Sequence, residues 1–388
     1  MRVIKCIFMI IGTAILMGGC ITPYTPEIRE SVEIMVINGL ITDREGYQYV
    51  EVARSSAVGN DESLLPVSDC IVEVQDDRGG IFSFTEADPG IYASWMTAQD
   101  LVPGTEYKLT VTTVEGRQYH SEFEELLPCP PIDSIIWEVR DMPTTDPNIT
   151  YEGVQFHIAT DATGNYANNY RWELEETWEY HAAYSIWGYF DGSISFGVFP
   201  SDSLRICWNT KRINDFFTYS TRNLSSNQIT QFPINYISNQ TDKLKIKYSL
   251  MVKQYSLTET AYELWKILEG QSKQSGELYA TQPVRISGNI TSLENPAETV
   301  LGFFSASSAT EKRIILSPQV SFLEAPYCLP YGLSGDSLMD FLSQISPYYY
   351  PVYLYDEGGL SPTFDYADQA CFDCRMLGGT TERPDFWR

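Results

Sequence analysis

The chain contains 388 residues, which is enough for two or three domains with cores of their own. Its formal net charge of −25 at pH 7 would repel nucleic-acid phosphates and anionic lipid headgroups. This argues against nucleic-acid binding and against membrane attachment through surface charge. Frequent Tyr, Thr, Ser, Val, Pro and Gly favour β-structure over helix.

The first twenty residues, MRVIKCIFMIIGTAILMGGC, have the layout of a secretory signal. A basic start is followed by an apolar run at residues 7–17, too short to span a membrane, and by two glycines. Cys20 comes directly after the glycines and resembles the lipobox of bacterial lipoproteins, although Met17 stands where a small or aliphatic residue is more usual. We expect a signal peptide at residues 1–19 and a lipidated tether at residues 20–31. The alternative is an ordinary signal peptide with a chance cysteine.

Residues 32–127 have the pattern of short strands separated by turns. In EYKLTVT, for example, Tyr107, Leu109 and Val111 alternate with polar residues, as in a half-buried strand. About seven such strands in about ninety residues predict an immunoglobulin-like or fibronectin-like β-sandwich. The proline-rich segment LLPCPPID, residues 126–133, is expected to be the linker that follows.

Residues 128–388 are predicted to form a larger antiparallel β domain. In NYRWELEETWEY, Trp172 and Trp178 share one parity, whereas Arg171 and Glu173 take the other. This alternation predicts a strand with one apolar and one charged face.

One amphipathic helix is expected near residues 257–270. Ser256 and Glu259 have the spacing of a capping box at its start. Apolar residues then recur at helical spacing, which predicts one buried stripe made of Leu257, Ala261, Leu264, Trp265 and Leu268.

Six cysteines remain if Cys6 leaves with the signal and Cys20 carries lipid. An even set in an exported protein predicts disulfide bonds, so the candidates are Cys70, Cys129, Cys207, Cys328, Cys371 and Cys374.

The pair in CFDC, Cys371 and Cys374, raises three possibilities: a zinc site, a redox centre and a disulfide clasp. No second Cys-x-x-Cys supports zinc, and the pair does not sit at a helix start after a strand, as a redox centre requires. We therefore expect no metal site and a clasped tail, with bonds from these two residues to Cys328 or Cys207. The connectivity stays open at this stage, and each bond would supply about 2–4 kcal/mol.

Motifs for catalysis are missing from the sequence, which has no Gly-x-Ser-x-Gly elbow and no His-Glu-x-x-His. The three histidines, His120, His157 and His181, lie far apart without ligand spacing. We therefore expect no catalytic residue, no cofactor and no enzyme activity. Because 51 acidic residues could still bring two carboxylates together, an undetected hydrolase stays an alternative.

Aromatic residues are too dense at 166–190 to fill a single core face. Exposed Trp and Tyr anchor ligands and protein partners. We expect Trp178 to be core and Trp187 to be exposed, with Tyr184, Trp187 and Tyr189 as possible ligand or partner contacts. The alternative is that the whole stretch fills the core and plugs loops.

Three blocks carry a family resemblance: YSLMVKQYSLTETAYELWKILEG, the GELYATQPVRISGNIT segment after it, and CFDCRMLGGTTERPDFW at the end. Together they resemble the domain-of-unknown-function family DUF4249. Its members are exported lipoproteins of Gram-negative bacteria, often encoded beside TonB-dependent receptors. The resemblance implies a non-enzymatic outer-membrane accessory protein, anchored by lipid, that captures ligand or acts as a scaffold for such a transporter. The membrane face, periplasmic or surface, stays undecided. A stand-alone glycan- or peptide-binding module is the first alternative.

Overall fold

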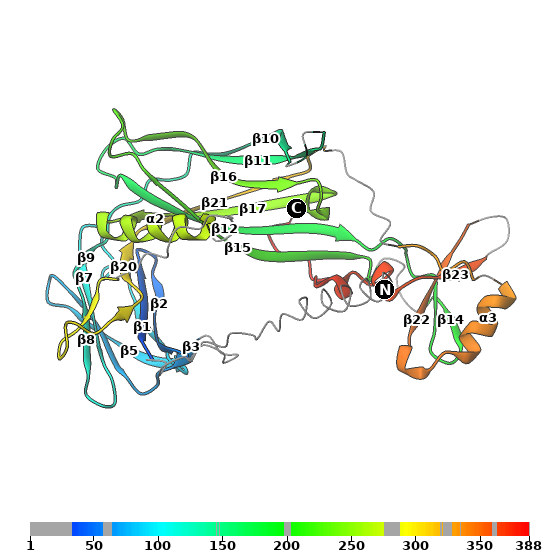
Figure 1. The fold of residues 1–388 in the computed structure, drawn as a ribbon, viewed down its shortest axis with the longest axis horizontal. Helices are drawn as coiled ribbons and strands as arrows, with labels where there is room; N and C mark the ends of the chain where they lie inside the picture. The colour runs from blue at the N-terminus through cyan, green and yellow to red at the C-terminus, as the bar shows by residue number, and fades with distance from the viewer. Residues whose placement is uncertain are drawn as a thin grey trace, which may run out of the picture.

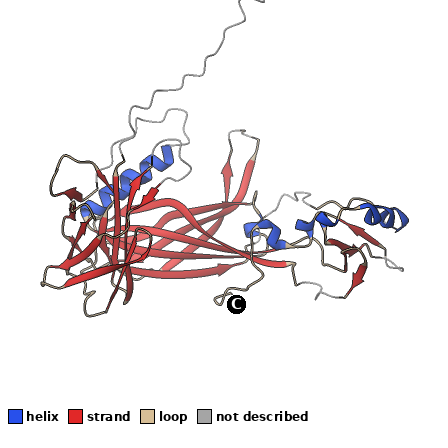
Figure 2. Ribbon diagram, turned by 90° about the horizontal axis from the view of Figure 1, so that it is seen from below, coloured by secondary structure: helices blue, strands red, loops and turns tan. Residues whose placement is uncertain are grey.

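The computed structural model describes residues 33–56, 64–144, 146, 148–197, 203–274, 288–318, 320, 328–333, 335–358 and 363–387. Strands make up most of the regular structure, as Figure 2 shows, so the prediction of a mainly β protein is confirmed. The expected signal peptide, Cys20 and the tether lie outside the described residues.

The N-terminal region forms one sheet of twelve strands rather than the expected two-sheet sandwich. Along its main path the order is β18-β8-β7-β4-β5-β6-β2-β1-β19, and the sheet is nearly closed around one apolar core. Nine of the strands come from the N-terminal stretch: β1 Met35–Thr42, β2 Gly46–Ser55, β3 Leu64–Pro66, β4 Ile71–Asp76, β5 Ile81–Asp88, β6 Ile91–Met96, β7 Glu106–Thr112, β8 Gln118–Ser121 and β9 Glu124–Glu125.

Three strands of this sheet come from a segment that the sequence assigned to the second region. They are β18 Ile290–Ser292, β19 Val300–Leu301 and β20 Phe304–Ser307. β18 pairs with β8, whereas β19 and β20 both run parallel to β1. Gly302 lies between β19 and β20 with a φ of 97°, and a Cβ there would be 2.0 Å from the Ile37 carbonyl oxygen. Only glycine fits such a close approach, and it lets both short strands pair with β1.

The second region contains two sheets that enclose one core (Figure 1). One sheet has the order β10-β11-β16 and the other β15-β12-β17-β21. The alternation predicted for β12 is confirmed, since Trp172 and Trp178 lie in the shared core. The strand bounds are β10 Ser134–Pro143, β11 Thr150–Asp161, β12 Asn169–His181, β15 Ile206–Ser220, β16 Gln228–Ser238, β17 Lys247–Leu257 and β21 Ala309–Leu316, with a 3-10 turn η1 at Asp242–Leu244.

The expected helix is α2, Glu259–Gln274, and it lies over β12 and β15 in Figure 1. Its start differs from the prediction. Ser256 still belongs to β17, where its hydroxyl hydrogen-bonds a backbone carbonyl, whereas Thr258 Oγ1 accepts the amide of Ala261 at 3.2 Å. Thr258 therefore caps the helix, two residues later than the capping box predicted.

A small lobe lies at the opposite end of the molecule from the N-terminal sheet (Figure 1). Its sheet has the order β14-β13-β22-β23 and packs against a second helix, α3, although the sequence predicted only one. The apolar spacing of Leu338 and Leu342 on α3 was hidden in a loop-rich stretch. The bounds are β13 Gly188–Phe190, β14 Ile194–Phe196, α3 Gly335–Gln344, β22 Val352–Asp356 and β23 Phe364–Tyr366, with 3-10 turns η2 Pro347–Tyr349, η3 Gln369–Cys371 and η4 Cys374–Leu377.

Two disulfide bonds hold the tail. Cys207 of β15 is bonded to Cys374, and Cys328 is bonded to Cys371. The clasp is thus present, and the connectivity that the sequence left open is resolved. The prediction was wrong for two other cysteines, because Cys70 and Cys129 are free. These two lie in different regions of the chain, Cys70 in the N-terminal core and Cys129 against Gln254 and Thr310.

None of the helices among the described residues is long and apolar enough to cross a membrane.

Candidate functional site

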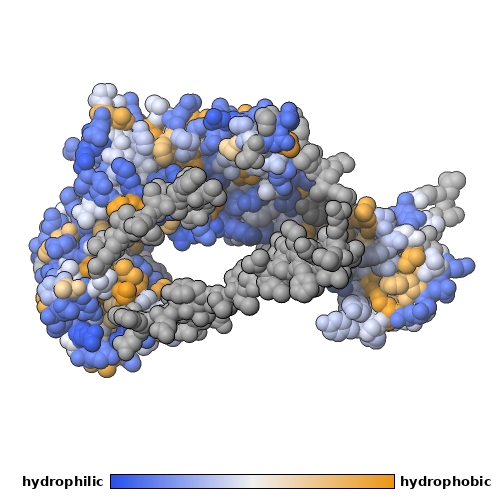
Figure 3. All heavy atoms as spheres, viewed as in Figure 1, coloured by the Kyte–Doolittle hydropathy of each residue, from blue (hydrophilic) through white to orange (hydrophobic). Residues whose placement is uncertain are grey.

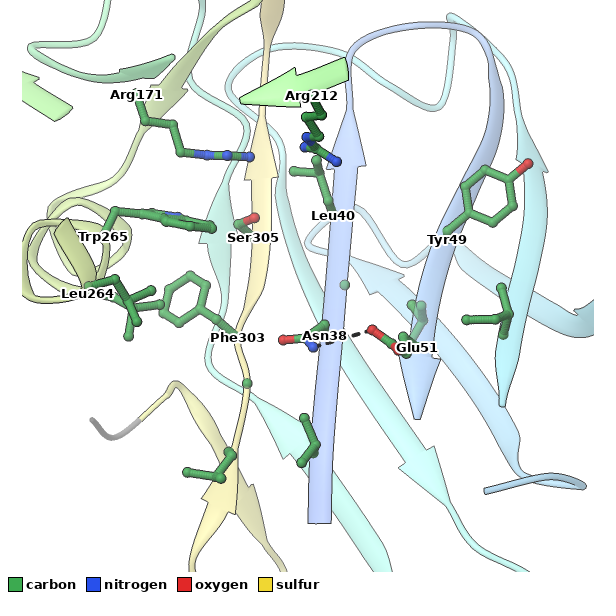
Figure 4. Close-up of a pocket in the computed structure, with 17 residues that line it drawn as sticks. Asn38, Leu40, Tyr49, Glu51, Arg171, Arg212, Leu264, Trp265, Phe303 and Ser305 are labelled. Carbon is green, nitrogen blue, oxygen red and sulfur yellow. Dashed lines mark hydrogen bonds between the residues drawn. The ribbon is translucent and has the colours of Figure 1, made fainter. Parts of the chain in front are cut away.

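An open cavity of about 900 Å³ lies where the N-terminal sheet, α2 and the second region meet. Figure 4 shows its lining residues, which come from β1, β2 and β6, from the segment 301–305, from α2 and from strands β12 and β15. The volume is within the range of pockets that bind small molecules. On the face seen in Figure 3, by contrast, hydrophobic residues form only small patches among hydrophilic ones.

The floor of the cavity is the outer face of β1. Ile37 and Ile41 point into the core of the N-terminal sheet, so Val36, Asn38 and Leu40 point the other way. Val36 and Leu40 are four residue steps apart, which is about 13 Å along the strand. The strand register places Leu40 between Tyr49 and Ser305 at one end of the cavity floor. It places Val36 beside Leu301 at the other end.

The opposite wall is the apolar stripe of α2. Leu264, Trp265 and Leu268 line the cavity. In Figure 4, Leu264 and Trp265 lie beside Phe303 of the segment between β19 and β20. The stripe was predicted from sequence, but only part of it is sealed in a core. Trp265 and Leu268 are half-buried, and they offer apolar surface to whatever enters the cavity.

Two arginines lie at the Leu40 end of the cavity (Figure 4). The Arg171 guanidinium is buried between two aromatic rings, 4.3 Å from the centroid of Tyr255 and 4.3 Å from that of Trp265. Such cation–π contacts hold the guanidinium in one plane. The Arg212 side chain, in contrast, is 65% exposed and reaches into the cavity mouth.

Glu173 is the common partner of both arginines. Its carboxylate lies 2.7 Å from Arg171 and 2.6 Å from Arg212, and it accepts the Tyr255 hydroxyl at 3.1 Å. Burial alone would raise the pKa of the Glu173 carboxyl, but the arginines and the hydroxyl outweigh it, so this pKa lies below its ordinary value. Burial, with the Glu173 charge, raises the pKa of Tyr255 to about 12. Two cations and one anion leave this end of the cavity with net positive charge in a strongly acidic protein.

A strip of exposed aromatic rings continues from the cavity rim. Tyr47 and Tyr49 project from the outer face of β2, and Trp95 projects from β6 opposite Tyr47. Tyr47 packs edge-on against Trp95 with ring centroids 5.2 Å apart. Each of the three residues is more than half exposed. This strip was not predicted, although Tyr47 and Tyr49 have the opposite parity to the core residue Val50, which marks the exposed face of β2.

The aromatic residues singled out from the sequence lie elsewhere: Trp178 in the core of the second region, and Tyr184, Trp187 and Tyr189 toward the small lobe. Trp187 is 52% exposed and Trp178 is 6% exposed, which confirms the expected assignment of the two. Tyr184 is half-buried and its ring stacks on that of Tyr355, with the ring centroids 4.2 Å apart. Its hydroxyl donates a hydrogen bond of 3.0 Å to the carbonyl oxygen of Cys328. Neither these residues nor Tyr189 lines the cavity. A contact role for Tyr184, Trp187 and Tyr189 stays a prediction.

Within the ranges given above, no three His, Cys, Asp or Glu side chains are grouped so that they could hold a metal ion. Burial raises the pKa of the Cys129 thiol to about 11, which disfavours the nucleophilic thiolate form at neutral pH.

The fold and the site together define a mainly β protein with an open, ligand-sized cavity whose one end is cationic. A family model described as "Domain of unknown function (DUF4249)" matches residues 21–313, and the chain belongs to this family. The match includes every residue that lines the cavity and stops before the clasped tail. No curated protein matches the chain in sequence.

Proposed function

We propose that this protein is a lipid-anchored outer-membrane accessory protein that captures a ligand for a TonB-dependent transporter and does not transform it. The single observation that carries the proposal is the cavity of about 900 Å³, apolar along most of its length and cationic at one end. The membrane anchor in this proposal rests on the lipobox-like position of Cys20. The transporter partner rests on the family resemblance.

The geometry of the cavity favours capture. Its floor is a strand paired on both sides, and at its cationic end the largely buried ion pair of Arg171 with Glu173 is held by stacked rings. Because these groups are already ordered, a ligand does not have to bear the entropy cost of arranging them. The exposed position of Arg212 and Tyr49 on the rim leaves the cavity open for a ligand to enter and leave.

The same lining favours binding over turnover. Glu51 is the one carboxylate among the described residues that line the cavity, and neither His nor Cys is among them. Glu51 accepts a long hydrogen bond of 3.5 Å from Asn38 and has no second acid at hand for acid–base work. Conversion of a bound ligand that is abolished by Glu51→Gln would contradict the non-enzymatic part of the proposal.

The transporter partnership is tested by purification from native outer membranes in mild detergent. We expect a TonB-dependent barrel to remain bound through affinity purification in a fixed ratio. Exchange of Cys20 for Ala should lower the yield of the complex, because the anchor no longer concentrates the protein at the membrane. Purification of the wild-type protein as a monomer without a barrel would refute the partnership.

A stand-alone glycan- or peptide-binding module is the second candidate, and the strip Tyr47–Tyr49–Trp95 favours it. Exposed, mutually packed aromatic rings offer flat apolar surface with polar edges. For this candidate, Trp95→Ala should weaken binding to immobilised glycans or peptides. The exposed Trp187 of the small lobe provides the matched control, because Trp187→Ala removes the same ring outside the strip.

A further inference from the structure

We propose that the cavity binds an amphiphile with one anionic head group, a carboxylate or a phosphate, on an alkyl chain. This inference rests on the proposed ligand-capture function and names the class of ligand. The head group lies at Arg212 and Arg171, and the alkyl chain lies along β1 between this strand and α2.

The charges that face the cavity decide where an anion can lie. Arg171, Arg212 and Glu173 together carry net positive charge at the Leu40 end. Glu51 pairs with Asn38, which lies two residues from Leu40 in the direction of Val36. This separation is about 7 Å along β1. An anionic head beside Leu40 is thus close to the arginines, and the one carboxylate of the lining is opposite the middle of the alkyl chain. The reverse orientation would place an anion among apolar side chains.

The two arginines contribute differently. Arg171 is fixed between Tyr255 and Trp265 and is already paired with Glu173, so it supplies a permanent positive field and orients the network. Arg212 is also paired with Glu173, at 2.6 Å, but its side chain is 65% exposed and extends into the mouth, so its remaining N–H groups can donate to a head group. Charge-assisted hydrogen bonds of this kind are the strong ones, and an arginine fork suits both carboxylate and phosphate.

The remainder of the cavity suits an alkyl chain. From Leu40 the lining continues past Phe303 and Leu264 to Val36 and Leu301, over about 13 Å. It is apolar apart from the pair Asn38 and Glu51 near its middle. An extended chain of about this length removes apolar surface of both partners from water. Decanoate is therefore a suitable probe.

The test is calorimetric titration of the full chain carrying Cys20→Ala, which removes the acylation site, with probes kept below their micelle concentrations. Four probes share one chain length: decanoate, decyl phosphate, decan-1-ol and decylamine. We expect the two anions to bind more tightly than the alcohol, and decylamine to bind least. Equal affinity of the alcohol and the anions would overturn the head-group assignment, and no binding of either anion would overturn the ligand class. Comparison of decanoate with decyl phosphate shows which anion the site prefers.

Matched variants locate the two ends of the ligand. Arg212→Ala should weaken both anions about tenfold and leave the alcohol unchanged, whereas Arg212→Lys should restore part of the loss. Arg222→Ala is the control, because Arg222 is a similarly exposed arginine paired with Glu259 outside the cavity. At the apolar wall, Leu268→Glu should abolish binding of all probes, while Ile267→Glu, on the exposed side of the same helix turn, should not.

These results are separable from the transporter partnership. If the barrel copurifies but decanoate does not bind, the ligand class is wrong and the accessory function stands. If decanoate binds as described but no barrel copurifies, the site is right and the partnership is wrong.

Discussion

Removal of the two disulfide bonds, one at a time, should destabilise the protein to different extents. Each bond is deleted as a pair, Cys207→Ala with Cys374→Ala or Cys328→Ala with Cys371→Ala, so that no unpaired thiol remains. The bonded residues are 167 positions apart in the first case and 43 in the second. Loop-closure entropy in the unfolded chain then gives about 5 and about 4 kcal/mol, a difference of about 1 kcal/mol.

Packing adds to this difference in the same direction. Cys207 and Cys374 are both fully buried, whereas Cys328 is only half-buried. Loss of the sulfur atoms therefore leaves the larger defect at the bond between Cys207 and Cys374. This bond also holds the start of the tail against β15, close to the backbone pairing of Trp208 with Thr380.

Urea unfolding under non-reducing conditions, followed by circular dichroism and by tryptophan fluorescence, measures both losses. Cys70→Ala breaks no disulfide bond and serves as the control, with an expected cost of about 1 kcal/mol. If deletion of the bond between Cys328 and Cys371 costs as much as deletion of the other bond, loop length does not set the stability of the clasp and the reasoning fails.

Three further predictions concern single side chains. Trp178→Ala should cost about 3–5 kcal/mol in the free energy of unfolding, because its ring lies in a core, whereas Trp187→Ala should cost about 0.5 kcal/mol. Equal decreases of the melting temperature for the two variants would contradict this assignment. Cys20→Ala should release the protein from membranes, because its net charge of −25 offers no other attraction, and sedimentation of the variant with outer membranes in high salt would count against the lipid anchor. Burial raises the pKa of the Glu124 carboxyl although Thr258 and Asn289 donate hydrogen bonds to it. Its contribution to stability is therefore full below the pKa of the unfolded chain and is lost as the pH rises through the folded pKa. Glu124→Gln should remove that part of the pH dependence, which urea titrations of both proteins between acidic and neutral pH would reveal.

Patterns of short range are sufficient for several features of this protein. The two faces of β12, the apolar stripe of α2 and the contrast between Trp178 and Trp187 all follow from side-chain periodicity and from neighbouring turn residues. Periodicity depends only on backbone geometry, so it can be recognised before any tertiary contact is known. The expected export of the protein and the positions of its cysteines predicted bonds from the tail cysteines to Cys207 or Cys328. They did not determine which cysteine pairs with which.

Only the tertiary structure decided the arrangement of the site. β18, β19 and β20 complete a sheet whose other strands lie more than 160 positions earlier, and such non-local pairing leaves no mark in a local pattern. The charged face of β12 is covered in part by α2, and this is what brings Arg171 between two rings and into the lining of the cavity. Composition and periodicity determined that the chain would be a β protein with a clasped tail. The cavity and its cationic end arose from the packing of segments that are far apart in the sequence, because a site of this kind exists only where such segments meet.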